Sequence, residues 1–418
     1  MVMGDLKMGK NTLPSVIIMG GSTNAISVAR SLGREGIRVY AVNGPNEYVR
    51  YSRYCHFICP SQEGYLPEAW ERYLLGDESE HLRGSVLLAC EDTALEIVIK
   101  NREDLSRKFV LDIMNKEAQL CMLNKLCTYE AAINAGIPIP KFWRVENLEQ
   151  ILMHEKEYVF PLILKPIYSH KFVEVFKCKF FLVNSFDELI KAYLKIDQFG
   201  IVVMLVEKIL GPDDRYCSYY TYIDENGEAL FDFTKRIIRR YPYNQGGACY
   251  HITDWNPEVR DLGLKFFTHV GLIGLANIEF KRDDRDGKLK LIECNARFTA
   301  ANCLVEKSGF DLALFVYNRL VGRIQPSLKG KSYKEGLRLW YPTEDFLSFK
   351  ELRRRGELSF VEWVKSIMHP LILPYFRWYD PIPTIVSESK RIYRFIKKRI
   401  PDFILFRKLI GRIDLKPS

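Results

Sequence analysis

The stretch Leu289-Lys-Leu-Ile-Glu-Cys-Asn-Ala-Arg-Phe298 decides the fold of this chain. Three polar side chains, Glu293, Asn295 and Arg297, recur at every second position of an otherwise apolar run. Because successive side chains of a strand point to opposite faces, these three share one face if the stretch is extended. The other face then carries Ile292, Cys294 and Ala296. A carboxylate, an amide and a guanidinium on one face predict a polar site rather than a core surface.

A second carboxylate, Glu279, lies shortly before this stretch in Ala276-Asn-Ile-Glu-Phe280. The intervening segment 281–288 contains three aspartates and Gly287, which predicts a hairpin turn between antiparallel strands. Glu279 and Glu293 would then lie side by side. Carboxylate and amide oxygens are hard ligands that Mg²⁺ prefers, with coordination positions left for water and phosphate. The alternative is an ordinary hairpin whose charges are solvated.

Length and composition limit the classes of protein to which the chain can belong. A chain of 418 residues suits two to three compact units with ample core. Its ten cysteines include no C-x-x-C pair, and unpaired thiols of this kind are typical of a reducing compartment. No apolar run approaches the length that spans a bilayer. We therefore expect a cytoplasmic protein.

The positive charge of the chain is confined to its C-terminal part. Residues 331–418 contain 19 Lys and Arg against 10 Asp and Glu, an excess that equals the net charge of +9 of the whole chain. The body before Lys331 is therefore electrically neutral. Because aromatic residues are also not interleaved with the tail cations, nucleic acid is not expected as a partner.

Residues 14–110 alternate between strand and helix patterns, which predicts a parallel α/β sheet. Gly20-Gly-Ser after the first strand could favour an anion at a helix N-terminus, or could serve a tight turn that needs glycine. Glu91 and Asp92 directly follow the strand 85–90. They could be ligand groups at the carboxyl edge of the sheet or acids that open a helix.

The middle of the chain carries several cations beside apolar strands. Residues 115–136 predict one helical stretch, which contains Lys125. Lys165 ends an apolar strand directly before a proline, which favours an anion ligand, and residues 171–183 read as a basic and apolar strand pair. Lys235, Arg236 and Arg239 precede a glycine-containing loop. They indicate a site for an anionic substrate, with a solvated edge strand as the alternative.

Taken together these residues resemble the ATP-grasp superfamily, and within it the carboxylate–amine ligases, over residues 14 to about 325. The resemblance implies an α/β fold with an N-terminal parallel α/β (pre-ATP-grasp) domain, a two-part α+β ATP-grasp domain and a basic helical C-terminal tail. The implied bounds are 14–110 for the first domain, 111–205 for the lid subdomain, 206–330 for the metal- and nucleotide-binding subdomain and 331–418 for the tail.

The resemblance also assigns roles to individual residues. Glu279, Glu293 and Asn295 resemble the metal ligands, and Arg297 the arginine beside the reacting acyl group. Two lysines, Lys125 and Lys165, resemble those that bind the nucleotide phosphates. Glu207, Lys208 and Leu210 resemble the hinge that holds the adenine. Either Asp213 or Asp214 resembles the acid that binds the ribose.

The implied reaction activates a carboxylate as an acyl phosphate and joins it to an amine, with ATP and Mg²⁺ (or Mn²⁺) as cofactors and small molecules as both substrates. A phosphotransferase acting on a hydroxyl and a catalytically silent nucleotide-binding module are the alternatives. The sequence departs from the family at the flap after Lys165, because the segment 166–172 contains no glycine. Ser169, His170 and Lys171 are the candidates to cover the γ-phosphate instead.

The basic tail is not explained by the resemblance. Ile392, Phe395, Ile396 and Ile400 recur at helical spacing, with cations on the other side, and the segment 403–410 resumes an apolar and basic pattern. One interpretation is a helical pair docked on the α/β body. The other is an interfacial helix that makes peripheral contact with an anionic membrane.

Overall fold

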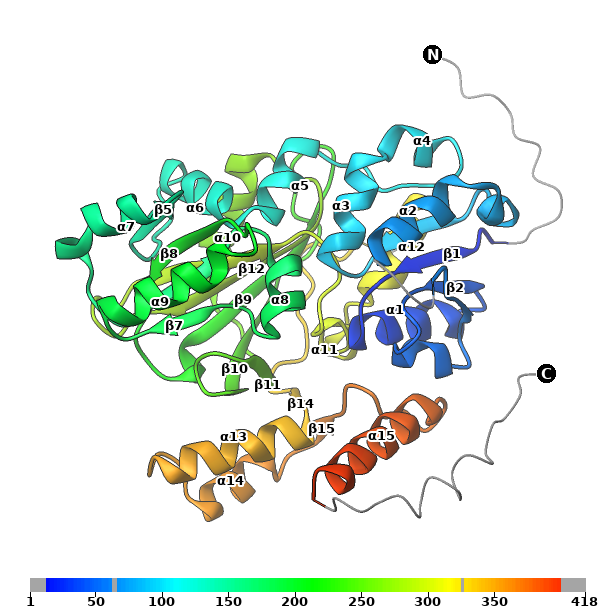
Figure 1. Cartoon of the computed structure of the whole chain (residues 1–418). Helices are drawn as coiled ribbons and strands as arrows, with labels where there is room; N and C mark the ends of the chain where they lie inside the picture. The colour runs from blue at the N-terminus through cyan, green and yellow to red at the C-terminus, as the bar shows by residue number, and fades with distance from the viewer. Residues whose placement is uncertain (1–12, 62–65, 325–326, 400–418) are drawn as a thin grey trace.

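The computed structural model describes residues 13–61, 66–324 and 327–399. Figure 1 shows the N-terminal unit on one side of the molecule, a larger two-sheet unit on the other and a helical C-terminal extension beneath both. Within the described residues, no helix is long and apolar enough to cross a membrane.

The N-terminal unit contains the predicted parallel sheet, with strand order β3-β2-β1-β4. All four residues of β1 are buried, as expected when helices cover both faces of a parallel sheet. Its strands are β1 (Val16–Met19), β2 (Val39–Val42), β3 (His56–Ile58) and β4 (Val86–Ala89). Its helices are α1 (Thr23–Arg34), η1 (Tyr48–Tyr51), α2 (Leu66–Leu75), η2 (Asp77–Leu82), α3 (Asp92–Lys100) and α4 (Arg102–Ser106).

A four-stranded antiparallel sheet of order β5-β8-β6-β7 follows. Its strands are β5 (Phe142–Val145), β6 (Leu162–Pro166), β7 (Phe181–Val183) and β8 (Val203–Glu207). The helices of this region are α5 (Lys116–Leu123), α6 (Lys125–Asn134), α7 (Leu148–Met153), η3 (Glu155–Glu157), α8 (Ser169–Phe176) and α9 (Phe186–Asp197).

Two sequence-based expectations in this region were wrong. The single helical stretch over 115–136 is two helices, because Asn124 is extended and its side chain accepts from the backbone N–H groups of Leu126 and Cys127, which starts α6 anew. The segment 171–183 is not a strand pair, since its first half belongs to helix α8 and only β7 is a strand. A short amphipathic segment of mixed aromatic and basic residues fits either period.

The central sheet has seven strands in the order β13-β12-β9-β10-β11-β14-β15. The predicted hairpin is confirmed as β12 and β13, which pair antiparallel across the turn at 283–288. The strands are β9 (Tyr216–Ile223), β10 (Phe233–Tyr241), β11 (Gly247–Thr253), β12 (Gly274–Arg282), β13 (Leu289–Asn295), β14 (Arg338–Trp340) and β15 (Leu371–Ile372). The helices are η4 (Asp213–Arg215), α10 (Pro257–Val270), α11 (Asn302–Ser308) and α12 (Leu312–Leu320).

The hydrophobic core joins these units where the polar face of β13 ends. One core cluster contains residues of β1, β2 and α1 together with residues of α11 and α12 that follow β13 in the chain. The chain therefore passes from the candidate metal residues directly into helices that pack on the N-terminal unit, and this fixes the two units against each other.

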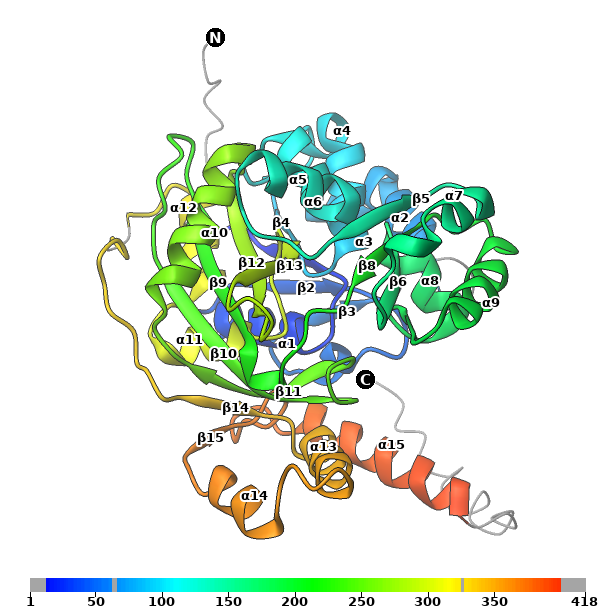
Figure 2. The same cartoon turned by 90° about the vertical axis from the view of Figure 1, so that its left-hand side faces the viewer.

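The C-terminal extension contains α13 (Pro342–Arg354), α14 (Phe360–Ile367) and α15 (Ile382–Arg399), with β14 and β15 completing the central sheet (Figure 2). It is anchored by two ion pairs between buried side chains, Arg30–Asp380 at 2.8 Å and Arg239–Asp345 at 2.6 Å. These two ion pairs dock the region of Asp345 and Asp380 on the body, but Ile392 of the apolar pattern is 58% exposed, so both interpretations of the tail helices stay predictions. The apolar and basic pattern over 403–410 lies outside the described residues.

Candidate active site

The candidate metal residues lie in register on neighbouring strands. Glu279 of β12 pairs with Glu293 of β13, and Asn277 pairs with Asn295. The Asn295 Nδ2 donates to Asn277 Oδ1 at 3.0 Å, which leaves the Asn295 Oδ1 available as a ligand. Two carboxylates and one amide oxygen are the hard donors that suit Mg²⁺. Across the described ranges no group of three or more His, Cys, Asp or Glu could hold a metal, so the amide belongs to the donor set if a metal binds here.

A β-bulge in this hairpin changes the face of one residue. Phe280 pairs with Leu291 while Glu279 pairs with Glu293, so Ile292 is the extra residue on β13. Cys294 and Ala296 are buried in the core as predicted, but Ile292 lines a cavity beside Glu293. The freed Ile292 carbonyl accepts from the Lys165 Nζ at 3.0 Å and from the Tyr129 hydroxyl at 3.3 Å.

This cavity lies between the four-stranded sheet and the central sheet, and we call it the intersheet cavity. Its apolar lining is contributed by both sheets and by α6, from Tyr129, Pro140, Ile163, Phe180, Val206, Ile209 and Ile292. Three lysines, Lys125, Lys165 and Lys179, reach its polar end, where Glu293 lies. An apolar slot that ends in cations and a carboxylate pair can hold a flat base at one end and polyphosphate at the other.

The cations and the carboxylate at this end shift one another's pKa. Burial, with help from Lys125, lowers the pKa of Lys165 to about 8, and burial also lowers the pKa of Lys125. Burial acts to raise the pKa of Glu293, but Lys179, Lys165 and Lys125 outweigh it and hold that pKa below its ordinary value. Glu293 is therefore ionised at neutral pH, as a metal ligand must be.

The three residues expected to form the adenine hinge, Glu207, Lys208 and Leu210, differ in whether they line the intersheet cavity. Glu207 and Lys208 line the intersheet cavity, with Glu207 paired to Arg285, whereas Leu210 does not line it. Neither ribose candidate lines it either. Asp214 is exposed, and the buried Asp213 accepts from the backbone N–H groups of Arg240 and Asn244 at 2.9 and 3.0 Å.

Asp213 therefore holds the β10–β11 turn rather than facing the cavity, and burial raises its pKa to about 6. The turn that it supports places Asn244 and Gln245 on the lining.

A second cavity, of about 640 Å³, lies between the N-terminal unit, the central sheet and the C-terminal extension. We call it the central cavity. Glu279, Glu293, Asn295 and Arg297 line it, and of these Glu293 also lines the intersheet cavity, so Glu293 stands at the border of the two cavities.

The basic cluster of β10 is divided by an irregularity in the strand. Lys235 lines the central cavity, and its Nζ donates to Ser218 Oγ at 3.1 Å. Arg236 lies on the other face and pairs with Asp254. Arg239 would share the face of Lys235 in a regular strand, but register shifts on both sides of it turn it away, toward Asp345. Of the three predicted substrate cations, only Lys235 reaches the cavity, and Arg240 takes the place of Arg239.

Arg240 is the functional residue that the sequence reasoning missed most clearly. It lines both cavities, stacks on the Tyr216 ring at 4.3 Å and has a buried Nη1 atom with no hydrogen-bond partner among the residues that the structure describes. A buried guanidinium N–H without a partner indicates an anionic ligand. Lys179 was also missed, because nothing in its loop sequence distinguishes it. The side chains of Ser169, His170 and Lys171 lie outside the described residues.

Arg297 is held in place from the N-terminal unit. Its guanidinium makes two parallel hydrogen bonds to Asp92, from Nε at 2.5 Å and from Nη2 at 3.0 Å. Gly20 and Gly21 both have positive φ, and the Gly21 N–H donates to Glu91 Oε2 at 2.8 Å. The glycine pair thus forms the tight turn that one of the two interpretations required, and Glu91 lines the central cavity while Asp92 orients Arg297.

The comparisons with known proteins agree with this geometry. No family model matches the chain. It is 25% identical to D-aspartate ligase of Enterococcus faecium over 404 residues, covering 87% of this chain and 94% of that protein. It is 26% identical to D-alanine–D-alanine ligase of Francisella tularensis over 223 residues, covering 50% of this chain and 70% of that one.

A similar fold is found in the biotin carboxylase domain of the Hydrogenobacter thermophilus 2-oxoglutarate carboxylase, solved with MgADP and bicarbonate. The TM-score is 0.61 at 16% identity, and the match covers 78% of this chain and 73% of that one.

The fold, with two sheets that enclose lysines next to a register pair of acidic residues, is similar to that of the ATP-grasp enzymes. In sequence the chain is similar to carboxylate–amine ligases of that class, the D-aspartate ligase and the D-alanine–D-alanine ligase.

Proposed function

We propose that this protein is an ATP-dependent ligase that converts a carboxylate into an acyl phosphate and joins it to an amine, releasing ADP and phosphate. The observation that carries the proposal is the position of Glu293, which lines both the intersheet and the central cavity and pairs in register with Glu279 of the central cavity. A nucleotide in the first cavity would present its terminal phosphate to a substrate in the second.

The residues of the chain bind and orient the reactants. Lys125, Lys165 and Lys179 would bind the phosphates. Their positive charges would then already be in place when the phosphoryl group is transferred. Glu279, Glu293 and Asn295 would hold Mg²⁺, which would supply positive charge to neutralise the phosphates during transfer. Arg297, fixed by Asp92, is placed to stabilise the oxygen of the acyl group.

We further propose that the carboxylate substrate is an amino acid of the D-aspartate kind. The proposal is supported by the coverage of 94% of the D-aspartate ligase. It is also supported by Lys235 and Arg240 in the central cavity, which could hold a second carboxylate while the first one reacts. Lysine and arginine side chains form charge-assisted hydrogen bonds with a carboxylate that binds beside them.

The experiment is an ADP-release assay with the purified chain, ATP, Mg²⁺ and single amino acids, in the presence and absence of hydroxylamine. A ligase forms an acyl phosphate, which hydroxylamine converts into a hydroxamate that mass spectrometry detects. ADP with a phosphate ester as the product would instead identify the phosphotransferase, and no ADP with any acid would identify the silent module.

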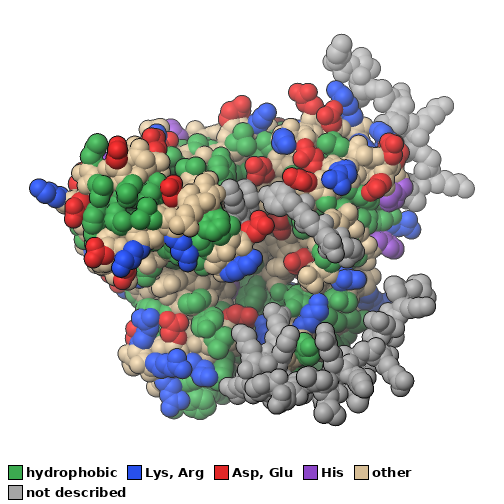
Figure 3. Space-filling view, in the orientation of Figure 1, with side chains coloured by type: hydrophobic (Ala, Val, Ile, Leu, Met, Phe, Trp, Pro, Cys, Tyr) green, Lys and Arg blue, Asp and Glu red, His purple; other side chains and the backbone are tan. Residues whose placement is uncertain are grey.

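We also propose a cytoplasmic location, with peripheral contact to anionic membranes through the C-terminal extension. The support is the basic character of 331–418 and the exposure there of large apolar side chains such as Trp378, which is 87% exposed, and Ile385, at 60%. Figure 3 shows Lys and Arg side chains gathered on this part of the visible face. Sedimentation with anionic vesicles at low salt tests it, and a chain that stays in solution refutes it.

A further inference from the structure

The central cavity has an acidic wall that the phosphoryl transfer does not use. Three connections meet there from the carboxyl edge of the parallel sheet: Gly20–Ser22 after β1, Glu47 after β2 and Glu91 after β4. Open α/β sheets bind ligands at this edge. The side chains of Glu47 and Glu91 therefore line the same cavity as Glu279 and Glu293 of the central sheet.

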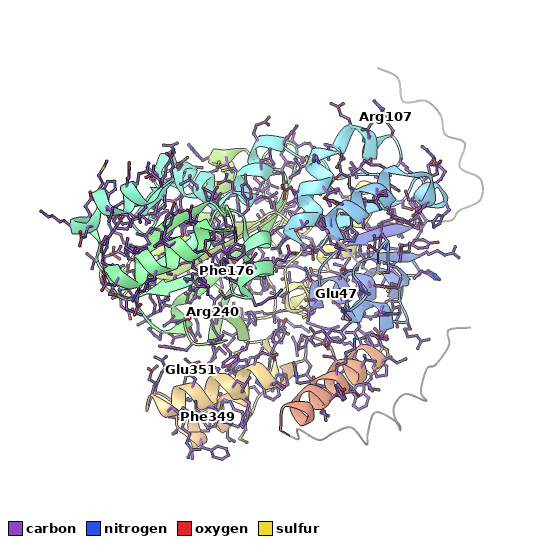
Figure 4. All side chains as sticks on the ribbon, in the orientation of Figure 1. Glu47, Arg107, Phe176, Arg240, Phe349 and Glu351 are labelled. Atoms are coloured by element: carbon purple, nitrogen blue, oxygen red, sulfur yellow. The ribbon has the colours of Figure 1, made fainter. Side chains whose placement is uncertain are left out.

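The two walls of the cavity differ in charge. The side of the central sheet carries the cations Lys235, Arg240 and Arg297 beside the candidate metal carboxylates Glu279 and Glu293, whereas the charged lining from the N-terminal unit is Glu47 and Glu91. Figure 4 shows the labelled Glu47 on the N-terminal side and Arg240 on the side of the central sheet. A cavity divided in this way fits an anion on one side and a cation on the other.

The acidic groups are available to a ligand. The Glu47 side chain makes no hydrogen bond or ion pair within the described part of the chain, and the charged groups that face it are Glu91 and Lys390, with the Tyr375 hydroxyl nearby. Glu91 is fixed through Oε2 by the Gly21 N–H, and its Oε1 has no partner among the described residues. Burial, reinforced by Glu91, raises the pKa of Glu47 to about 7.

An independent observation also points to a polar ligand in this cavity. His251, only 5% exposed, lines it, and in the described part of the chain the Nδ1 atom of its ring finds no hydrogen-bond partner. Burial, Lys235 and Arg240 lower its pKa, so the ring is neutral. Buried polar atoms are rarely left unpaired unless a ligand or water completes them. The C-terminal extension closes the cavity beside it with Tyr341 and the Glu344–Arg391 pair.

We propose that Glu47 and Glu91 form the acceptor subsite of the ligase, where Glu91 binds the incoming amine as its ammonium ion and Glu47 takes the proton that the amine must lose. This inference rests on the proposed function and adds the acceptor half to it. An amine reaches a protein at neutral pH mainly as ammonium, which has no lone pair to attack.

The step balances within the cavity. The ammonium gives one proton to the Glu47 carboxylate and becomes a neutral amine. Its lone pair attacks the carbonyl carbon of the acyl phosphate, so the C–N bond forms while the bond from carbon to the phosphate oxygen breaks. Phosphate leaves with that electron pair, and the second proton released from nitrogen goes to the departing phosphate.

The test compares two small nucleophiles with the full-length protein, ATP, Mg²⁺ and a mixture of D- and L-amino acids that includes D-aspartate. Ammonium chloride supplies a nucleophile that is protonated near neutral pH, whereas hydroxylamine is largely neutral there. Glu47→Gln should slow amide formation from ammonium by about 100-fold, the usual contribution of a general base, and leave hydroxamate formation nearly unchanged. Its ammonium reaction should recover as the pH approaches the pKa of ammonia.

Glu91→Gln should raise the KM for ammonium more than it lowers kcat, because it removes binding rather than proton transfer. Glu35→Gln is the matched control, since Glu35 is an exposed glutamate of the same unit that lies outside the cavity. Three results would overturn the inference. Glu47→Gln could lose the same activity with both nucleophiles, or it could keep full activity with ammonium. The unsubstituted protein could also fail to use ammonium. Absence of hydroxamate in the unsubstituted protein would count instead against the proposed function.

Discussion

Removal of the Asp380 carboxylate should destabilise the protein far more than the loss of an average side chain. In the folded chain the carboxylate accepts from Arg30 Nε at 2.8 Å, from Ser52 Oγ at 2.7 Å and from the Arg53 N–H at 3.0 Å. The Arg30 and Asp380 side chains are only 4% and 1% exposed. Asp380→Ala leaves the Arg30 guanidinium buried without its counter-ion.

The expected cost is about 3–5 kcal/mol in the free energy of unfolding, because an uncompensated buried charge remains. Urea denaturation followed by circular dichroism measures it. The double variant Arg30→Met/Asp380→Leu should recover most of the loss, since it removes both charges together. Asp104→Ala is the control, because the Arg107–Asp104 pair is 76% and 62% exposed and should contribute less than about 1 kcal/mol.

A loss below about 1 kcal/mol for Asp380→Ala would refute the reasoning, because the contacts would then not be the anchor of the extension. A double variant as unstable as the single one would refute it too, since the cost would then come from lost packing and not from the buried charge of Arg30.

Three other changes test the site. Glu293→Gln should lower ADP release by at least about 100-fold with the fold intact, measured at saturating Mg²⁺, because a neutral amide is a weak ligand; wild-type rates would refute the metal assignment. The affinity for ATP, measured by calorimetry, should fall as the pH rises through about 8, where Lys165 loses its charge, and Lys165→Arg should remove this dependence; a flat profile in the unsubstituted protein refutes it. Arg240→Ala should abolish ligation without unfolding the protein, whereas Arg239→Ala should cost about 3–5 kcal/mol of stability through the buried Asp345, and the reverse pattern would contradict the placement of these two arginines.

The sequence predicted those parts of the site that follow from strand periodicity. Glu279 and Glu293 were placed side by side because alternation and a turn signal are local properties, and the pairing register confirms this. The errors arose where the backbone departs from regularity. The irregular register of β10 exchanged Arg239 for Arg240, and a bulge in β13 turned Ile292 into the intersheet cavity.

Other residues of the site carry no local signal at all. Lys179 lies in a loop, and its position depends on how α8 and β7 pack, which is a tertiary property. Asp213 looked like a ligand because acids follow strand ends in many sites, yet it binds the backbone of its neighbouring turn. The contribution of the C-terminal extension to the central cavity was not anticipated, since the tail was judged from its charge and helical period alone.

The pairing of β14 with β11 has a consequence for handling shortened forms of the protein. Tyr250, His251 and Ile252 of β11 lie opposite Trp340, Leu339 and Arg338. A chain that stops at Gly330 would leave β11 at the border of the sheet, with a row of unsatisfied N–H and C=O groups beside apolar side chains. Such a border is a template for strand addition from another molecule. The catalytic body expressed without its extension should therefore self-associate, and β14 protects the sheet against aggregation.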